Sequence, residues 1–139
     1  MSGNSDGGHF LSAVISVHNE EARLSDCLER LAFADEIVVL LDKCTDGSEA
    51  VARRFTDRVE KGDWTKEGER RNVGIAACSG DWVFEIDADE RVPDALAHEI
   101  RRVVDSTPYD WHEIPVNNYI GRKLVRWGWG ASFGKAAYP

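Results

Sequence analysis

Residues 80–91 read Gly80-Asp81-Trp82-Val83-Phe84-Glu85-Ile86-Asp87-Ala88-Asp89-Glu90-Arg91 and contain the pattern that decides the fold. A turn residue opens the stretch, a mostly apolar run too short for a helix follows, and three acidic residues stand where that run ends. This pattern predicts a largely buried strand that delivers carboxylates to the edge of a sheet.

Asp87 and Asp89 are two residues apart, so an extended chain points both carboxylates to the same side. Two carboxylates on one side repel each other unless something positive lies between them. A hard divalent cation with oxygen ligands, carrying a diphosphate, would meet this need. The alternative is that Asp-Ala-Asp-Glu is only a polar turn before a helix that starts at Pro93.

Length and composition describe one soluble globular domain. The chain has 139 residues, of which 42% are hydrophobic and 30% charged. The formal net charge of −8 argues against a general nucleic-acid binder, which needs a basic face. It leaves room for a nucleotide ligand, because a metal ion and a few arginines can hold phosphates inside an acidic protein.

The cysteines and the apolar runs bear on location. Cys27, Cys44 and Cys78 are odd in number and widely spaced, which is typical of reduced thiols in a cytosolic protein. No secretory signal is visible, and the longest aliphatic run, Ile37 to Leu41, cannot span a bilayer. We expect a cytoplasmic protein and leave peripheral contact with the inner membrane open.

Strands and helices are predicted to alternate along the first 107 residues. Asn19 and Thr65 are the predicted caps of the first and third helices, and Gly80 the left-handed residue that follows the third. Strands are expected at 10–17, 36–41, 58–60 and within 80–91, and helices around 24–31, 51–55, 66–78 and from 93 to 107.

This alternation implies a mostly parallel sheet with helices on both faces. In such sheets the ligand crevice lies outside the carboxyl ends of the strands. Those ends carry His18-Asn19-Glu20, then Asp42, then Asp87-Ala88-Asp89, so the three groups should meet along one edge.

The character of the chain changes after Pro108. Residues 109–130 are aromatic, basic and glycine-rich, which favours two short strands and a flexible loop. Trp127 and Trp129 either stack on a sugar or base or fill a core. We divide the chain into a disordered leader (1–9), an α/β donor-binding region (10–107) and the start of an acceptor-side region (108–139) with no closing element.

These motifs together resemble the family 2 glycosyltransferases of GT-A fold, and more narrowly the lipopolysaccharide-core glucosyltransferase type of bacterial envelope synthesis. The resemblance implies a Rossmann-like GT-A nucleotide-sugar-binding domain that is incomplete at its C-terminal end. The motifs are His18-Asn19-Glu20-Glu21, Asp42, Thr45-Asp46-Gly47-Ser48, Arg71-Asn72, Gly80-Asp81-Trp82, Asp87-Ala88-Asp89-Glu90-Arg91 and Asn117-Asn118-Tyr119-Ile120-Gly121-Arg122.

The resemblance also implies roles for single residues. His18, Asn19 and Glu20, together with Asp42, would hold the uracil and ribose of a nucleotide-sugar donor. Arg71 and Arg70 would approach the diphosphate. Asp87 and Asp89 would form the pair that binds Mg²⁺ or Mn²⁺, with Asp89 as the direct ligand and Asp87 nearer the ribose.

Each of these residues also has a structural interpretation. In this interpretation Asp42 caps the second helix, and Arg70 and Arg71 pair with Glu67 and Glu69 or with solvent. Glu85 requires either an open sheet face or a cationic partner, because an unpaired carboxylate in a buried strand is costly.

The function implied is inverting transfer of a sugar, UDP-linked, to a cell-envelope glycan or lipopolysaccharide-core acceptor. Two departures from the family pattern matter: Lys43 and Cys44 occupy a loop where small or acidic residues are usual, and relatives continue beyond this chain. We therefore assign no general base; Asp110 and Glu113 have no context that marks either one.

Two alternatives remain open. One is a nucleotide-sugar-binding module without catalysis. The other is metal-dependent phosphoryl transfer. It is disfavoured because that chemistry usually places its paired aspartates after the first strand, where this chain has His18-Asn19-Glu20.

Overall fold

The computed structural model of the chain describes residues 8–116, 118–120, 123–125 and 134–138. Most of the predicted leader, and both Trp127 and Trp129, lie outside these ranges. The elements are β1 (Leu11–Val17), α1 (Glu21–Glu29), β2 (Glu36–Asp42), α2 (Ser48–Arg53), β3 (Val59–Gly62), α3 (Glu67–Ala77), β4 (Trp82–Asp87), α4 (Asp94–Ser106), β5 (His112–Pro115), β6 (Asn118–Ile120), β7 (Lys123–Val125) and β8 (Gly134–Tyr138).

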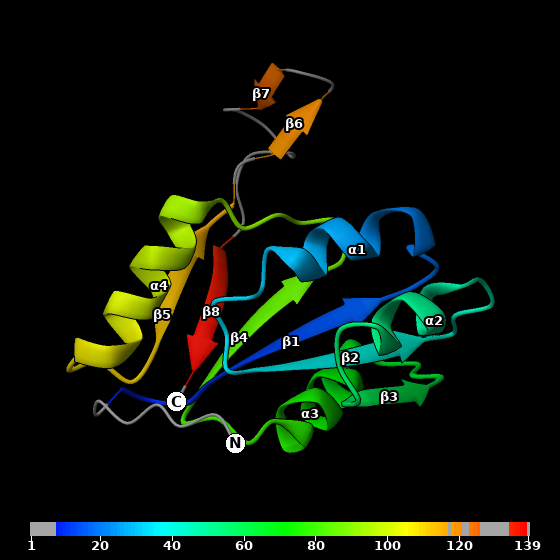
Figure 1. Ribbon diagram of the computed structural model, residues 1–139, viewed down its shortest axis with the longest axis horizontal. Coiled ribbons are helices and arrows are strands. Elements are labelled where there is room, and N and C mark those ends of the chain that lie inside the picture. Colours follow the sequence, from blue (N-terminus) through cyan, green and yellow to red (C-terminus); the bar gives the residue numbers. More distant parts are fainter. Residues whose placement is uncertain (1–7, 117, 121–122, 126–133, 139) are drawn as a thin grey trace.

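Six strands form one sheet in the order β3-β2-β1-β4-β8-β5, and β6 pairs with β7 separately (Figure 1). β1 pairs in parallel with β2 on one side and β4 on the other, and β2 pairs in parallel with β3. β8 runs antiparallel to both β4 and β5. The prediction of a mostly parallel α/β sheet is therefore confirmed.

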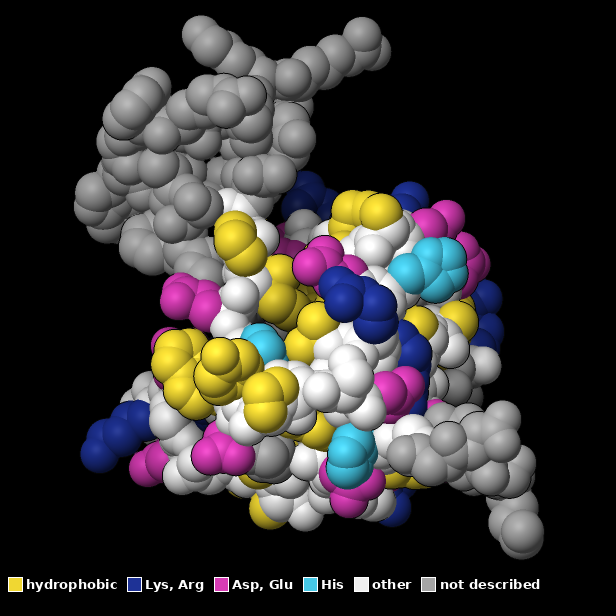
Figure 2. All heavy atoms as spheres, turned by 90° about the vertical axis from the view of Figure 1, so that its left-hand side faces the viewer, with side chains coloured by type: hydrophobic (Ala, Val, Ile, Leu, Met, Phe, Trp, Pro, Cys, Tyr) yellow, Lys and Arg dark blue, Asp and Glu magenta, His cyan; other side chains and the backbone are white. Residues whose placement is uncertain are grey.

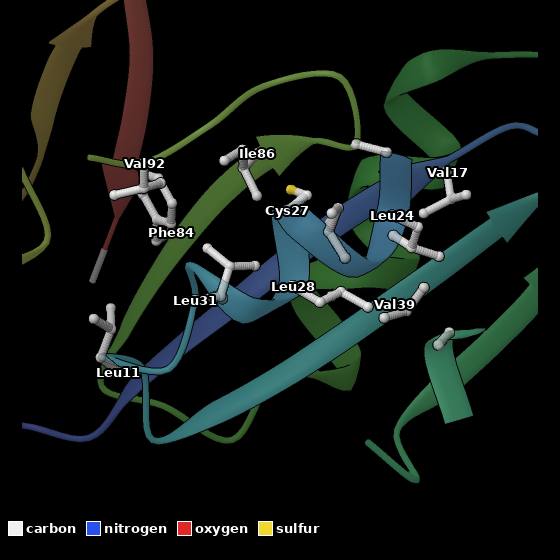
Figure 3. Packing of buried hydrophobic residues seen from close by; sticks show 14 of the residues in the cluster. Leu11, Val17, Leu24, Cys27, Leu28, Leu31, Val39, Phe84, Ile86 and Val92 are labelled. Carbon is white, nitrogen blue, oxygen red and sulfur yellow. The ribbon is translucent and has the colours of Figure 1, made fainter. Parts of the chain in front are cut away.

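One face of the sheet is covered by α1, α2 and α4. Leu24 and Leu28 of α1 and Ile100 of α4 join the side chains of β1 that face this side in the larger hydrophobic core. Figure 3 shows α1 lying across the strands with Cys27 close to Ile86 of β4. Burial on this face explains why α1, whose sequence is otherwise polar, forms a helix here.

The opposite face is covered by α3. Val14, Leu40 and Val83, from three neighbouring strands, pack there against Val73 of α3. A Cβ atom on Gly74 would lie 2.7 Å from Leu40 Cδ1 and 2.9 Å from Val14 Cγ2, so α3 approaches the sheet too closely for a side chain at this position. Helices on both faces, as predicted, leave the central strands apolar on both sides.

Three predictions about helix ends and their neighbours are wrong. α1 begins after Glu20 and α3 after Lys66, and neither helix has a side-chain cap from Asn19 or Thr65. Gly80 is not left-handed; it is needed because a Cβ would lie 2.6 Å from Ser12 Oγ.

One strand was not predicted from the sequence: residues 134–138 form β8. β8 lies between β4 and β5, with Phe84 and His112 both opposite Ala137. Its short, alanine-rich sequence has little strand preference of its own, so its pairing depends on partners far away in the chain. The boundary predicted between residues 107 and 108 separates α4 from β5, and strands from both sides of it share the sheet.

The side of the molecule formed by α4 and β5 carries many hydrophobic side chains (Figure 2). Tyr109 is 69% exposed and Trp111 is 61% exposed. Beside them, a cavity of about 150 Å³ is lined mainly by apolar residues of α4 and β5 and by Trp82. In the described ranges, no helix is long and apolar enough to cross a membrane.

A polar network closes the amino-terminal edge of the sheet, opposite the predicted site. Glu36, whose side chain is mostly buried, accepts hydrogen bonds from Ser12 Oγ at 2.5 Å and from the Ser79 backbone N–H at 2.8 Å. Arg58 adds a salt bridge at 3.4 Å. Burial raises the pKa of the Glu36 carboxyl, but the hydrogen bonds from Ser12 and Ser79 and the Arg58 charge outweigh it, so the net pKa is lowered.

Two glycines of α3 provide a matched test of its packing. Alanine gains helix propensity at both positions. A Cβ on Gly68 meets no atom of the described chain within 4 Å, whereas one on Gly74 meets the core. We expect Gly74→Ala to be less stable than Gly68→Ala by about 1–3 kcal/mol, the usual cost of overpacking. Urea denaturation measures the difference, and equal stabilisation by both substitutions would contradict it.

The network around Glu36 predicts a pH dependence of stability. Because the folded-state pKa is depressed, the stabilisation is complete above the ordinary value of 4.5 and is lost as pH falls through the lower folded-state value. We expect the stability advantage of wild type over Glu36→Gln to shrink in this acidic range. Denaturant unfolding at several pH values measures it, and a difference that stays constant down to pH of about 3 would refute the prediction.

Candidate functional site

The carboxyl ends of β1, β2 and β4 meet at one edge of the sheet. Ser16 of β1 lies between Leu40 of β2 and Asp87 of β4 in the parallel register. Two residues further along, His18 and Asp42 lie side by side, and His18 Nδ1 is 2.8 Å from the Asp42 carbonyl oxygen. After β3 the chain crosses to the far side of β1, which makes β1 and β4 the switch point where α/β sheets place ligands.

The loops after β1 and β2 are hydrogen-bonded to each other. Asn19 Oδ1 accepts from the backbone N–H groups of Thr45 at 2.7 Å and Asp46 at 3.3 Å. In the opposite direction, Ser48 Oγ accepts from the Glu20 N–H at 3.2 Å. These bonds hold the two loops, residues 18–20 and 43–47, together beside Asp42, and we call this pair of loops the ledge.

Two residues of this ledge adopt the left-handed conformation. Asn19 has φ of 49° and Lys43 has φ of 54°. Asparagine tolerates this region better than most residues. The Lys43 backbone N–H donates to the Gly62 carbonyl oxygen at 2.9 Å, and its ammonium group donates to the Trp64 carbonyl oxygen at 3.1 Å. Hydrogen bonds to neighbouring segments therefore accompany the left-handed backbone at both positions.

Asp42 is the buried acid of the site, with 8% of its surface exposed. Its Oδ2 atom pairs with Arg70 Nη1 at 3.1 Å, and its Oδ1 accepts from the Trp64 backbone N–H at 3.3 Å. The carboxylate thus turns toward α3 and does not cap α2. Asp42 and Arg70, both predicted site residues, are brought together.

Arg71 lies one position further along α3 and contacts β4. Its guanidinium is 3.1 Å from Glu85 Oε1 and 3.4 Å from Glu67 Oε1. Glu85 therefore has the cationic partner that its place in a buried strand requires. Asp42 and Glu85 both face α3, and by the alternation along β4 Asp87 lies on the same side.

The acidic turn after β4 is compact. The strand ends at Asp87, and residues 88–89 form a turn, so the extended geometry that would align Asp87 with Asp89 does not continue. The Glu90 N–H donates to the Asp87 carbonyl oxygen at 2.9 Å, and the Asp87 N–H donates to Glu90 Oε2 at 2.9 Å. Asp89 is exposed at the tip of this turn.

The chemistry of this turn suits a hard divalent cation. Its side-chain donors are carboxylate oxygens, the ligands that Mg²⁺ and Mn²⁺ prefer. Within the described ranges, no group of three or more His, Cys, Asp or Glu side chains is arranged to hold a metal ion. A cation bound through Asp87 and Asp89 would therefore need further ligands from water or from a bound diphosphate.

The three cysteine thiols have no activating surroundings. All three cysteines are free, as expected for reduced cysteines. Burial raises the pKa of Cys44, and it raises the pKa values of Cys27 and Cys78 to about 11. Cys44 is therefore a structural thiol of the ledge, where it donates to the Val17 carbonyl oxygen at 3.3 Å.

With this geometry in place, comparison with known sequences assigns the family. The sequence model of Glycosyl transferase family 2 matches residues 12–129, most of the chain. The chain belongs to this family.

Two curated relatives show how much of a family member the chain represents. Over 91 residues, 62% of the chain, it is 37% identical to the lipopolysaccharide core biosynthesis glycosyltransferase LpsC of Rhizobium meliloti (strain 1021) and covers 34% of that protein. Over 101 residues, 72% of the chain, it is 29% identical to an uncharacterized glycosyltransferase of Rickettsia felis and covers 36% of it. The chain spans about a third of the length of these relatives.

Solved structures confirm the GT-A fold of this family 2 chain. Glucosyl-3-phosphoglycerate synthase from Mycobacterium tuberculosis, in complex with Mg²⁺ and UDP, superposes with a TM-score of 0.61 at 26% identity over 75% of this chain and 42% of that one. The mannosyltransferase PcManGT from Pyrobaculum calidifontis, in complex with GDP-Man and Mn²⁺, gives a TM-score of 0.61 at 19% identity, over 75% of this chain and 34% of that one.

Several residues of the candidate site make contacts that the sequence did not predict. Trp64 donates its backbone N–H to Asp42, which no sequence spacing indicates. Ser48 was quoted only within the motif Thr45-Asp46-Gly47-Ser48, yet its buried hydroxyl accepts a hydrogen bond from the Glu20 N–H. Arg91 was quoted only as the end of a motif, yet it makes four hydrogen bonds around the acidic turn. The signal available was position alone, since each residue follows or flanks a strand end.

Asn19 provides a test of the ledge. Both Asn19→Gly and Asn19→Ala lose the bonds to Thr45 and Asp46, but only alanine is strained at φ of 49°. We expect Asn19→Ala to be the less stable by about 1–2 kcal/mol, the usual cost of this conformation. Urea denaturation measures both variants, with Asn72→Ala on the exposed surface of α3 as control. If the two Asn19 variants are equally stable, the ledge is not strained at this position.

Proposed function

We propose that this chain binds the donor of an inverting glycosyltransferase, a UDP-linked sugar, and transfers its sugar to a cell-envelope glycan or lipopolysaccharide-core acceptor. The observation that carries the proposal is the convergence of Asp42 and Asp87 on the α3 side of one sheet edge, at the β1–β4 switch point, in a family 2 chain. The similarity to LpsC supports the acceptor class.

The nucleoside would lie against the ends of β1 and β2. His18, Asn19 and Glu20 form the β1 loop of the ledge and lie beside Asp42. The Asp42 carboxylate is already oriented by Arg70 and Trp64. A buried acceptor next to a guanidinium donor can recognise a base that offers both a donor and an acceptor. UDP in the complex of the Mycobacterium tuberculosis synthase supports uracil as the base.

The diphosphate would lie between α3 and the acidic turn. Arg71, half exposed beside Glu85, can donate charge-assisted hydrogen bonds to phosphate oxygens. Asp89 and Asp87 would hold Mg²⁺ or Mn²⁺, and such a cation neutralises charge on the departing nucleoside diphosphate. Both ions accompany nucleotides in the structural neighbours, which supports this cofactor.

Inversion requires a base that takes a proton from the acceptor hydroxyl as it attacks the anomeric carbon. We assign no residue of this chain to that role. We place the reaction in the cytoplasm, where free cysteines such as Cys27, Cys44 and Cys78 are usual, with a lipid-linked acceptor at the inner-membrane surface.

A binding module without catalysis is the second candidate. It differs from the first candidate only in catalysis, because transfer needs a general base and we assign no described residue to that role. The donor site in this case is the same, and only transfer is missing.

Calorimetric titration of UDP, with and without Mn²⁺, tests the donor site. We expect Mn²⁺ to tighten UDP binding to wild type. In Asp89→Asn the Mn²⁺-dependent affinity should fall at least about tenfold, because loss of a residue that only orients a metal ligand already costs this much. Asp81→Asn, at the other end of β4, is the matched control and should bind as wild type does.

The outcomes separate the candidates. Lack of UDP affinity both with and without Mn²⁺ would overturn both candidates. If UDP binds, release of UDP from UDP-glucose over time distinguishes an enzyme from a binding module.

A further inference from the structure

The acidic turn after β4 is tied to α1 by one side chain, Arg91. Its Nε donates to Asp26 Oδ2 at 2.5 Å, and its Nη2 donates to the Arg23 carbonyl oxygen at 3.1 Å, both on α1. Its Nη1 donates to the carbonyl oxygens of Ala88 at 2.9 Å and Glu90 at 2.8 Å. The guanidinium therefore bridges the helix and the turn.

The two carbonyl groups bound by Nη1 lie on either side of Asp89. One nitrogen atom thus fixes the peptide groups of Ala88 and Glu90 relative to each other. The rotation of the backbone that carries the Asp89 carboxylate is limited by these bonds. Asp89 itself is exposed, so the position of its carboxylate depends on the turn.

α1 is a firm support for this bridge. Its Leu24 and Leu28 side chains are buried in the main core, and Cys27 points toward the end of β4 (Figure 3). The Cys27 thiol also lies 3.9 Å from the Asp87 carbonyl oxygen. The hydrogen bond from Arg91, the leading cause, lowers the pKa of Asp26, which keeps this partner of the bridge charged.

We propose that Arg91 is a positioning residue that holds the acidic turn in the shape in which Asp89 binds the cation of the donor site. This inference rests on the proposed function. Its physical basis is preorganisation: a turn that is already fixed does not lose conformational freedom when the cation binds. Residues that orient metal ligands in this way typically contribute 10–100-fold to metal affinity.

The test compares UDP affinity with and without Mn²⁺ in variants of the chain. We expect Arg91→Ala to weaken the Mn²⁺-dependent affinity about 10–100-fold and to leave the metal-free affinity for UDP within about twofold of wild type. Arg91→Lys keeps the charge but not the fork of donors, so it should resemble Arg91→Ala.

Arg101→Ala is the matched control. Arg101 is as buried as Arg91 and also joins a helix to another segment, through Asp35, Asp105 and the His9 carbonyl oxygen, but at the opposite edge of the sheet. It should lower thermal stability as Arg91→Ala does and leave both UDP affinities unchanged. If Arg91→Ala does not fold, Asp26→Asn replaces it in the test. This substitution keeps the shape of the side chain and removes the negative charge that pairs with Arg91, so we expect a milder loss of the metal-dependent affinity.

The possible results are distinct. Wild type without Mn²⁺-dependent UDP binding would overturn the proposed function itself. Wild type with such binding, and Arg91 variants that match it, would overturn the role of Arg91 alone. Equal losses in the Arg91 and Arg101 variants would attribute the effect to general destabilisation and would also overturn it.

Discussion

The parallel pairing of β1 with β2 on one side and β4 on the other is the constraint on which the molecule depends. It places Ser16 between Leu40 and Asp87, and so fixes which residues leave the sheet together at its carboxyl edge. A slip of one residue in either pairing would turn the core side chains to the wrong face, because side chains alternate along a strand. Burial of both faces therefore specifies the register, and the register assembles the site.

α1 extends this arrangement from the strands to the loops. The helix follows directly from the ledge after β1, and its body carries Asp26 and Arg23, the partners of Arg91 on the acidic turn. Both parts of the candidate site, the loop after β1 and the acidic turn after β4, are thus attached to one helix whose apolar face is buried. Family 2 membership and the fold explain where the site lies; these contacts explain why its parts keep their positions.

The sequence predicted the fold well where the signals were local. The apolar run of β4 and the helical spacing of α4 depend on neighbouring residues, and the rule for strand ends then located Asp42 and Asp87. What the sequence did not predict depends on distant contacts. Asn19 was predicted to be a helix cap because asparagine is common just before a helix. The sequence could not show that its side chain instead binds the backbone of Thr45 and Asp46 in another loop. β8 was missed because its strand exists only through its partners.

On the α3 side of the sheet, acids that are already paired with arginine differ from Asp89, which is open to water. Asp42 and Glu85 are mostly buried, and each pairs with an arginine of α3, since an isolated charge there is costly. These pairs and the close approach of Gly74 together fix α3 over the strands. Asp89, by contrast, is exposed to water. A cation can approach it without breaking a buried ion pair, so the structure can gain a ligand there without losing the contacts that hold its site together.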